Sequence, residues 1–307
     1  MTITKGFMNN TEPLITIITP TYNRADCLKR CWESLCRQSF SDFQWLIIDD
    51  GSADNTEEVV KGFIAGSQFK IDYYKKKNGG KHTALNYSHP YIKGQYMAVL
   101  DSDDILTPTA LERLKDTWEK YGNNQEVGQV IFLKGYTEDK PICYVAHPDT
   151  LVDSIKEPRI SVSGRDCFDS YRTELFVKYS FPEFEGEKFI GEGSAFFFIE
   201  LESKAVYVNE VIYLCDYRDD GLTKAGRSMR MDNPLGGMYN SRVYMNSRLS
   251  LSTRLKKGVL YACYSKIAGK SFGETMSGNE YKLLTAITYL PGVLLSGYWK
   301  KKYSGGN

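Results

Sequence analysis

"LITIITPTYNRADCLKRCWESLCRQSFSDFQWLIIDDGS", residues 14–52, contains the pattern that decides the fold. Two β-rich apolar runs, 14–19 and 43–49, enclose an amphipathic stretch, 26–38, with the apolar spacing of a helix. A strand, a helix and a second strand in this order form a βαβ unit, in which the two strands lie parallel. We therefore expect this stretch to be the first unit of a larger sheet.

The same alternation continues toward residue 135. The amphipathic stretch "NTEEVVKGFIAG" (55–66) is followed by "FKIDYY" (69–74), and "KHTALNYS" (81–88) is followed by "QYMAVL" (95–100). Repeated βαβ units predict an α/β fold with a Rossmann-like, doubly wound, mostly parallel sheet.

Polar residues follow three of these apolar runs. Pro20-Thr21-Tyr22-Asn23 follows the first, Asp49-Asp50-Gly51-Ser52 the second, and Asp101-Ser102-Asp103-Asp104 the last. Each signal alone is weak, since Asp-Gly-Ser is also ordinary turn chemistry. Ligands of doubly wound sheets bind beyond the carboxyl ends of the strands, so the three signals together indicate one binding edge.

The stretch 101–104 holds three carboxylates, which repel one another unless a cation or hydrogen-bond donors offset their charge. Acids spaced two residues apart suit Mg²⁺ or Mn²⁺, which bind hard oxygens and share their coordination with phosphates. The sequence therefore predicts a metal site at Asp103 and Asp101. The alternative is an aspartyl-phosphate-type phosphatase with Asp101 as nucleophile. It fits poorly, because those enzymes usually have Thr or Val where Ile105 stands.

The composition is typical of a globular protein from a reducing compartment. With 307 residues, 42% of them hydrophobic, the chain can bury a sizeable core. Its seven Cys are an odd number without a CxxC pair, which argues against a disulfide framework. The N-terminus shows no apolar stretch long enough for a signal peptide, so we expect a cytoplasmic protein.

The C-terminal part differs in charge from the rest. Residues 241–307 hold eleven Lys and Arg against two Glu. We expect two domains, 1–225 and 226–307, the second being a basic amphipathic tail with two helices. Its apolar stretch 283–299 would extend about 25 Å as a helix, which is short of a bilayer core of about 30 Å.

The tail is therefore expected to lie at the inner face of the cell membrane as a peripheral anchor. Lys300, Lys301 and Lys302 follow the apolar stretch, and each basic residue adds about 1 kcal/mol of attraction to anionic lipid. The alternative is a helix docked on the protein with solvated lysines. No nucleic-acid-binding motif accompanies the positive charge, so we expect no nucleic-acid partner.

The order of the motifs resembles that of the family 2 glycosyltransferases of the GT-A fold. The resemblance covers residues 13–225, and members that build polysaccharides also contain a stretch similar to "FPEFEGEKFIGEG" (181–193). The matching motifs are "TPTYNRADCLKRCWESLCRQSFSDFQWLIIDDGSADNT" (19–56), "NGGKHTALN" (78–86) and "YMAVLDSDDILTP" (96–108).

The resemblance implies a role for each matching residue. Tyr22 and Asp50 would hold the nucleobase, since a Tyr ring can pack on a base and a carboxylate can accept its N–H. Asp101 would contact the ribose or a metal-bound water, and Asp103 would bind the metal on the diphosphate. Asp104 would support these two or cap the next helix. The implied nucleotide-sugar-binding residues are Pro20, Thr21, Tyr22, Asn23, Asp50, Gly80, Lys81, Asn86, Asp101 and Ser102.

The glycines before Lys81 permit close backbone approach, and a helix N-terminus with a lysine favours a phosphate. A simple glycine turn remains the alternative for Lys81. For His82 we expect a hydrogen-bonded structural role.

The reaction implied by the resemblance inverts the anomeric centre of a nucleoside-diphosphate sugar, most often UDP-linked. Mn²⁺ or Mg²⁺ is the implied cofactor, and the implied acceptor is a glycan or lipid-linked hydroxyl in cell-surface polysaccharide synthesis. One general base must assist the acceptor hydroxyl.

The acids that could be this base are Glu183, Glu185, Glu187 and Glu192. Glu192 is preferred, because relatives have an acid at this position before an apolar helix. Gly193 stands where relatives commonly have a second acid. Two alternatives therefore stay open: Glu192 caps its helix, or the chain is a membrane-docking module whose catalytic site has decayed.

"YRDDGLT" (217–223) is similar to a segment that follows the last strand in the family and often closes over the ligands. Arg218 would meet a phosphate there, and Asp219 or Asp220 a sugar. Some relatives contribute a His as third metal ligand from this region. This ligand stays unassigned here, because none of the three His residues is suitably placed by sequence.

Overall fold

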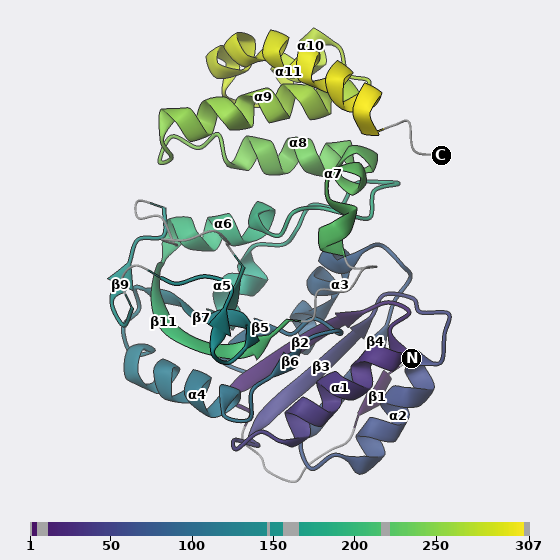
Figure 1. Cartoon of the computed structure of the whole chain (residues 1–307), viewed down its shortest axis with the longest axis vertical. Coiled ribbons are helices and arrows are strands. Elements are labelled where there is room, and N and C mark those ends of the chain that lie inside the picture. Colours follow the sequence, from purple (N-terminus) through teal and green to yellow (C-terminus); the bar gives the residue numbers. More distant parts are fainter. Residues whose placement is uncertain (1, 5–11, 146–147, 156–165, 216–221, 304–307) are drawn as a thin grey trace. The chain divides into compact units, whose positions relative to one another are not determined.

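The computed structural model describes residues 2–4, 12–145, 148–155, 166–215 and 222–303 (Figure 1). The chain divides into two compact units. The first contains residues 1–180 and 199–216, and the second contains 181–198 and 217–307. The sequence places residues 181–198 in the first domain, whereas in the structure they group with the C-terminal helices.

The first unit is built on one mixed sheet of 11 strands, in the order β1-β4-β3-β2-β5-β10-β7-β11-β6, with β8 paired to β7 and β9 to β11. The strands are β1 (Thr2–Thr4), β2 (Ile15–Thr21), β3 (Phe43–Asp49), β4 (Lys70–Lys75), β5 (Tyr96–Val99), β6 (Ile105–Leu106), β7 (Val127–Thr137), β8 (Lys140–Pro141), β9 (Leu151–Val152), β10 (Cys167–Arg172) and β11 (Lys204–Leu214).

The N-terminal half of this sheet is the predicted Rossmann-like part. Strands β4, β3, β2 and β5 are parallel neighbours, and every residue of β2 and β3 is buried. Burial on both faces explains the unbroken apolar runs in the sequence. The connecting helices are α1 (Ala25–Cys36), α2 (Thr56–Gly66) and α3 (Lys81–Ser88). Right-handed crossovers place α1 and α2 on one face of the strands and α3 on the other.

The other half of the sheet departs from parallel order. Strand β10 lies antiparallel between β5 and β7, and β11 runs parallel to β7. The sequence predicts two short strands at 205–208 and 211–217, but the structure has one continuous strand, β11. The polar residues Asn209 and Glu210 interrupt the apolar pattern at a register shift without ending the strand.

Two further helices complete the first unit, α4 (Ala110–Tyr121) and α5 (Thr173–Lys178), together with the short η1 (His89–Tyr91). Trp118 of α4 stacks on Tyr96 of β5 with ring centroids 3.9 Å apart. Its indole N–H donates to the Ser170 hydroxyl at 2.9 Å. These contacts hold α4, the first helix after the acidic stretch 101–104, against the sheet.

The second unit is helical. Its helices are α7 (Leu222–Asp232), α8 (Pro234–Val243), α9 (Leu251–Ile267), α10 (Phe272–Ser277) and α11 (Lys282–Tyr303), and α6 (Gly193–Glu202) begins in it and crosses into the first unit. The prediction of two helices in the tail was wrong, because short polar interruptions at Asn233 and at 246–250 end helices that read as continuous.

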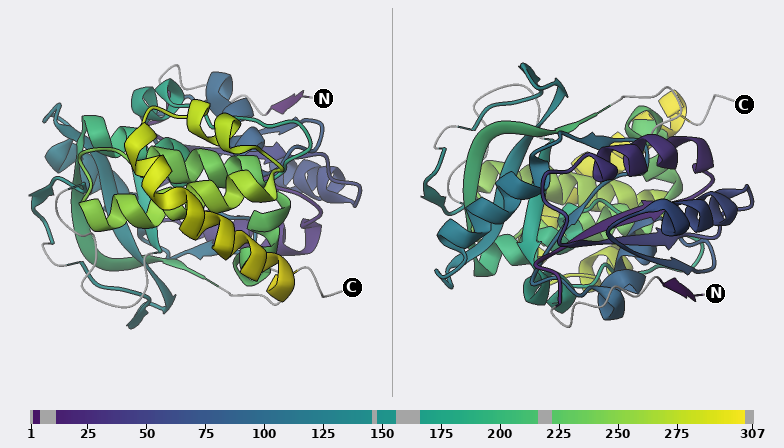
Figure 2. Two further views of the ribbon diagram at one scale, coloured as in Figure 1. Left: turned by 90° about the horizontal axis from the view of Figure 1, so that it is seen from above. Right: turned by 90° about the horizontal axis from the view of Figure 1, so that it is seen from below.

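Helix α9 lies between α8 and α11, and α11 crosses over it (Figures 1 and 2). Met245, Tyr261, Cys263 and Trp299 belong to the core of this unit. Within the described ranges, no helix combines the length and apolarity needed to cross a bilayer.

Candidate functional site

The three predicted polar segments meet at one edge of the first unit. Strands β3, β2 and β5 are adjacent and parallel, so their carboxyl ends point the same way. The Asp50 N–H donates to the Thr21 carbonyl at 2.8 Å, and the Leu100 N–H donates to Ile18 at 2.9 Å. Pairing therefore continues to the ends of the strands and fixes the segments that follow.

Asn23 and Ser52 connect two of these segments. The Asn23 N–H donates to the Ser52 hydroxyl at 2.9 Å, and the Asn23 amide oxygen accepts from the Ala53 N–H at 2.8 Å. Asn23 has a φ of 51°, a left-handed conformation that Asn tolerates better than most residues. Its observed contacts organise the loops, and its expected contact with a nucleotide stays a prediction.

Asp50 is buried, and its carboxylate is surrounded by donors. It accepts from the backbone N–H groups of Gly79 at 3.0 Å and Gly80 at 2.6 Å. Lys76 Nζ lies 2.6 Å from Oδ1, and the Asn78 amide donates to Oδ2 at 3.0 Å. This carboxylate therefore shapes the loop 76–80 before α3. Its contact with a nucleobase stays a prediction, and such a contact would share an acceptor already in use.

Two glycines allow these backbone conformations: Gly80 ends the loop 76–80, and Gly51 lies in the turn after β3. Their φ angles are 95° and 84°, which non-glycine residues rarely adopt. A Cβ on Gly51 would also lie 2.8 Å from the Asn78 nitrogen. The tight turn positions the first residue of α3, Lys81, against the acidic segment.

Lys81 forms an ion pair with Asp101, with Nζ and Oδ1 2.5 Å apart. Burial opposes ionisation of Asp101, but the charges of Lys81 and Lys134 outweigh it and lower the pKa of Asp101 below its usual value. The structure thus brings together two residues predicted for different parts of the nucleotide. Asn86 lies one turn further along α3 and is partly buried.

Tyr213, a residue of β11, fixes the segment 101–104. Its hydroxyl accepts from the Asp101 N–H at 3.1 Å and donates to the Asp104 carboxylate at 2.7 Å. Tyr213 is fully buried on β11, opposite Leu106 of β6 in an antiparallel pair. Asp104 is therefore a support of the turn, in agreement with one of its expected roles.

Lys134 supplies positive charge beneath this turn. Its ammonium lies 4.4 Å from the Tyr213 ring centroid and 3.0 Å from Asp166 Oδ1. Burial alone would lower the pKa of Lys134, but Asp166 and Asp101 raise it above its usual value, so the side chain stays charged. Sequence reasoning missed both Tyr213 and Lys134, because neither belongs to a local motif.

Asp103 differs from its two acidic neighbours. Its side chain is partly exposed, and among the described residues its carboxylate accepts no hydrogen bond and forms no ion pair. Asp101 is paired to Lys81 and Asp104 to Tyr213, so Asp103 is the acid of the turn that is open to a ligand. Tyr22, at the end of β2, is 48% exposed and presents a free ring surface at the same edge.

The donor set fits a hard divalent cation that shares its coordination with a substrate. Carboxylate oxygens suit Mg²⁺ and Mn²⁺, and an ion held by one or two carboxylates completes its shell with phosphate and water. Within the part of the chain that the structure describes, no cluster of three or more His, Cys, Asp or Glu forms a closed metal cage. The arrangement is that of an open site.

We expect Tyr213→Phe to lower the free energy of unfolding by about 1–3 kcal/mol, because it removes the hydrogen bonds that the buried Tyr213 hydroxyl makes with the Asp101 N–H and the Asp104 carboxylate. Urea unfolding measures this. Tyr136→Phe is the control: Tyr136 is 58% exposed, and surface changes of this kind shift stability by about 0.5 kcal/mol or less. Equal stability of the two variants would contradict the bridging role.

The acids proposed for the base lie in the second unit. Glu192 is exposed and immediately precedes α6, whose first turn begins with the Ala195 N–H donating to the Glu192 carbonyl at 3.1 Å. Glu187 has a different role, because its carboxylate accepts the N–H groups of Leu235 and Gly236, each at 2.7 Å. Glu187 therefore caps α8 and is removed from the candidates.

The segment 216–221, which contains Arg218, Asp219 and Asp220, lies outside the described residues, as does His147. The roles expected for the three residues at 218–220 stay predictions.

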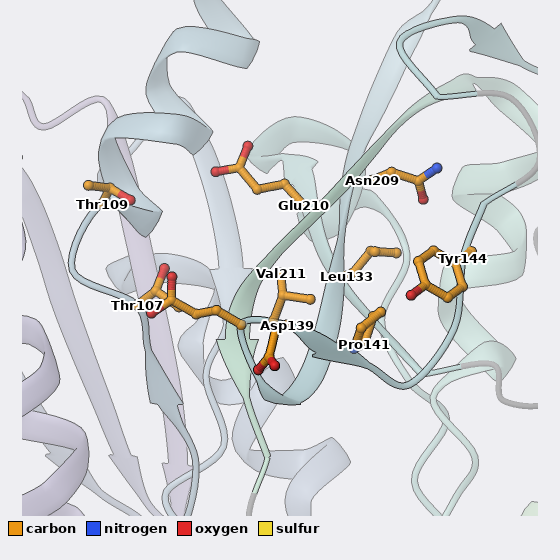
Figure 3. A pocket seen from close by; sticks show the side chains of 10 residues that line it. Thr107, Thr109, Leu133, Asp139, Pro141, Tyr144, Asn209, Glu210 and Val211 are labelled. Atoms are coloured by element: carbon orange, nitrogen blue, oxygen red, sulfur yellow. The ribbon is translucent and has the colours of Figure 1, made fainter.

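A separate hollow of about 330 Å³ lies over β7, β8 and β11 (Figure 3). Thr107, Asp139, Tyr144 and Glu210 are among the residues that line it, and the lining includes none of the predicted site residues. The Glu210 carboxylate is already paired with Arg113, at 2.8 Å. This hollow is therefore not the predicted nucleotide site, which is an open edge.

Comparison with known proteins identifies a matching family and similar folds. The family model described as "Glycosyl transferase family 2" matches residues 16–168. Glycosyltransferase GlyG of Streptococcus pneumoniae serotype 4 is 26% identical over 228 residues, which are 69% of this chain and 73% of that protein. Hyaluronan synthase of Pasteurella multocida is 40% identical over 103 residues, 34% of this chain but only 10% of the synthase.

Solved structures share the fold. Staphylococcus aureus TarS 1-349 in complex with UDP-GlcNAc matches with a TM-score of 0.59 and 14% identity, over 94% of this chain and 92% of that one. The mannosyltransferase PcManGT of Pyrobaculum calidifontis, in complex with GDP-Man and Mn²⁺, matches with a TM-score of 0.56 and 13% identity, over 97% and 89%. The expected α/β fold with C-terminal helices is confirmed.

Proposed function

This chain belongs to the family 2 glycosyltransferases of the GT-A fold, and from that premise we propose that it is a metal-dependent, inverting enzyme. It transfers a sugar from a nucleoside-diphosphate donor, UDP-linked, to a hydroxyl of a glycan or lipid-linked acceptor in cell-surface polysaccharide synthesis. The phosphatase alternative is set aside, because the family of the chain is that of sugar transferases.

This proposal rests most on the different surroundings of the three acids in the turn 101–104. Two of its three acids are held by the protein, Asp101 by Lys81 and Asp104 by Tyr213. The third, Asp103, is partly exposed and has no hydrogen-bond or ion-pair partner among the described residues. A rigid turn with one available carboxylate suits the direct binding of a cation that also contacts a diphosphate.

Asp103 would be the direct ligand of Mn²⁺ or Mg²⁺, and Asp101 the second acid near it. When bound, the cation neutralises the charge that develops on the departing diphosphate. Lys81 is the first residue of α3, and a positive charge at a helix N-terminus favours phosphate oxygens. Lys81 thus has two acceptors within its reach, the Asp101 carboxylate and a donor phosphate.

The nucleoside would bind at the ends of β2 and β3. Tyr22 offers an exposed ring for packing on a base. The Thr21 hydroxyl is buried and has no hydrogen-bond partner among the described residues, so a polar ligand at this edge would supply one. Pro20 and Ser102 are buried at the strand ends and shape this edge from below.

Glu192 is proposed as the base that accepts the proton of the acceptor hydroxyl. It is exposed, stands before a helix and, unlike Glu187, is not used to cap α8. A positioned base contributes about 10²–10⁴-fold in rate. Glu183 and Glu185 are also exposed and are the acids against which Glu192 has to be tested.

The donor and acceptor classes are supported by relatives. TarS was solved with UDP-GlcNAc, and PcManGT with GDP-Man and Mn²⁺. Hyaluronan synthase and chondroitin synthase of Pasteurella multocida match about 100 residues each. TarS favours a UDP-linked donor, PcManGT favours Mn²⁺, and the two synthases favour a polysaccharide product. We further propose that the protein works in the cytoplasm, at the inner face of the membrane, where its tail meets a lipid-linked acceptor.

The experiment that tests this function is a donor screen. We expect UDP to be released slowly from one UDP-sugar of a panel when Mn²⁺ is present, and at least about tenfold more slowly with EDTA. GDP-sugars are the control for the choice of nucleobase, and a phosphatase substrate such as p-nitrophenyl phosphate is the control for the type of reaction. Release that EDTA does not affect would contradict metal dependence.

The screen also separates the remaining alternative. Calorimetric binding of UDP with Mn²⁺, without hydrolysis or transfer of any donor, would favour a decayed catalytic site over an active enzyme. Absence of UDP binding under every condition would overturn the nucleotide site itself.

A further inference from the structure

The C-terminal helix α11 turns its large apolar residues outward. Five of them are exposed, from 57% at Tyr298 to 77% at Leu283. Their spacing of four, three, four and four residues places them in one row along the helix. We call this row the α11 stripe; its residues are Leu283, Ile287, Leu290, Leu294 and Tyr298.

The opposite face of α11 packs inside the unit and is made mainly of small residues. Thr285, Thr288, Gly292 and Ser296 are buried there, together with the larger Leu284 and Trp299 near the two ends of the helix. A Cβ on Gly292 would lie 2.5 Å from the Cβ of Ala262 on α9, so the two helices approach too closely for larger side chains. Helices of soluble proteins normally bury their apolar row. Packing within this unit therefore does not explain the α11 stripe.

The charged side chains of α11 are all positive. The helix has no acidic residue, and its lysines, Lys282, Lys300, Lys301 and Lys302, are all exposed. Helical spacing places Lys301 almost in line with the stripe, just beyond Tyr298. A row of leucines with a tyrosine and lysines at its end is the pattern of a helix that lies in a membrane interface.

From this geometry we infer that the α11 stripe is a docking surface for an anionic lipid bilayer. The helix lies along the membrane surface over about 22 Å, with the stripe in the acyl boundary and the lysines at the phosphates. The inference deepens the proposed function, on which it rests for the lipid-linked acceptor. It names the residues that make the contact.

A second copy of the chain is a weaker occupant. Stable protein interfaces use about 20–30 residues a side, far more than one row of five. In a symmetric pair with parallel α11 helices, the lysine clusters at the C-terminal ends would also face each other, where like charges repel. Anionic lipid matches both features, because its acyl chains can bury the α11 stripe and its phosphates can pair with the lysines.

The test measures binding of the full chain to vesicles by co-sedimentation. We expect binding to phosphatidylcholine vesicles that contain phosphatidylglycerol, and at least about tenfold weaker binding to phosphatidylcholine alone. Leu290→Glu with Leu294→Glu should reduce binding to the anionic vesicles at least about tenfold. Both positions are exposed, so circular dichroism should show an unchanged fold.

Tyr136→Glu is the matched control. Tyr136 lies in the first unit and is 58% exposed, close to the 57% of Tyr298, so Tyr136→Glu should bind vesicles like the wild type while Tyr298→Glu binds less. Undiminished binding of the Leu290, Leu294 variant would overturn the inference. So would a wild-type dimer in light scattering that the same variant dissociates. UDP release without vesicles tests the proposed function separately and should be equal in all these proteins.

Discussion

Asp103→Asn is expected to reduce sugar transfer by about 10³-fold or more. The amide keeps the size of the side chain but loses the charge that a hard divalent cation requires. A bound cation contributes several kcal/mol to the transition state, and each 1.36 kcal/mol is a factor of ten. Initial rates of transfer at saturating Mn²⁺ measure the loss.

Asp104→Asn is the matched control in the same turn. Its amide oxygen can still accept the hydrogen bond from Tyr213, so the turn keeps its support. We expect less than about tenfold loss of rate, well short of the effect at a direct metal ligand. If Asp104→Asn were as damaging as Asp103→Asn, or if Asp103→Asn kept wild-type rates, the assignment of the direct metal ligand would fail.

Glu192→Gln should lower kcat by about 10²–10⁴-fold while the affinity for the donor stays unchanged. Glutamine retains the size and hydrogen-bonding capacity of the side chain but cannot accept the proton of the acceptor hydroxyl. Transfer rates over a range of donor concentrations, together with calorimetric binding of UDP and Mn²⁺, separate the two quantities.

Glu185→Gln serves as the comparison, because Glu185 is an exposed acid of the same stretch. It should transfer sugar at near wild-type rate. Unfolding curves of both variants are needed, since a mere helix-capping role for Glu192 would show as lower stability with kcat preserved. A large loss at Glu185 with none at Glu192 would move the base to the former.

The parallel half of the sheet could be predicted from the sequence, because strands that are buried on both faces appear as unbroken apolar runs. Strands β2 and β3 are buried along their whole length, and amphipathic helices connect consecutive strands. The polar residues at their ends then belong to one edge by topology alone. The position of Tyr22, Asp50 and the turn 101–104 followed from this rule.

The supports of the site could not be predicted in the same way. Tyr213 lies in an apolar stretch of β11, where nothing local distinguishes a tyrosine that bonds to a distant turn from one that only fills the core. The same holds for Lys134 on β7, whose partner Asp166 is far away in sequence. The donors around Asp50 were also missed. The sequence suggests that the glycines 79 and 80 let a ligand approach the backbone, but their N–H groups can equally bind a carboxylate of the protein, as they do here.

The helical unit shows a different limit of pattern reading. An apolar period in 283–299 predicts an apolar face, but it does not say whether that face points inward. Close packing of α9 and α11 selects small residues at the contact, as Gly292 beside Ala262 illustrates. Five large side chains then lie on the outer face, the reverse of the usual arrangement, and only Leu284 and Trp299 are buried among the large residues of this helix that the structure describes.

The bond between Tyr213 and Asp104 joins residues that are 109 positions apart in the chain. A ribosome that adds about 5–20 residues per second makes the acidic turn roughly 5–20 s before the strand that holds it. In the growing chain, the parallel strands β2 to β5 are therefore complete several seconds before the hydrogen bond from Tyr213 can fix the turn 101–104. The newly made protein should become able to hold a sugar nucleotide only late in translation, after β11 has emerged and paired.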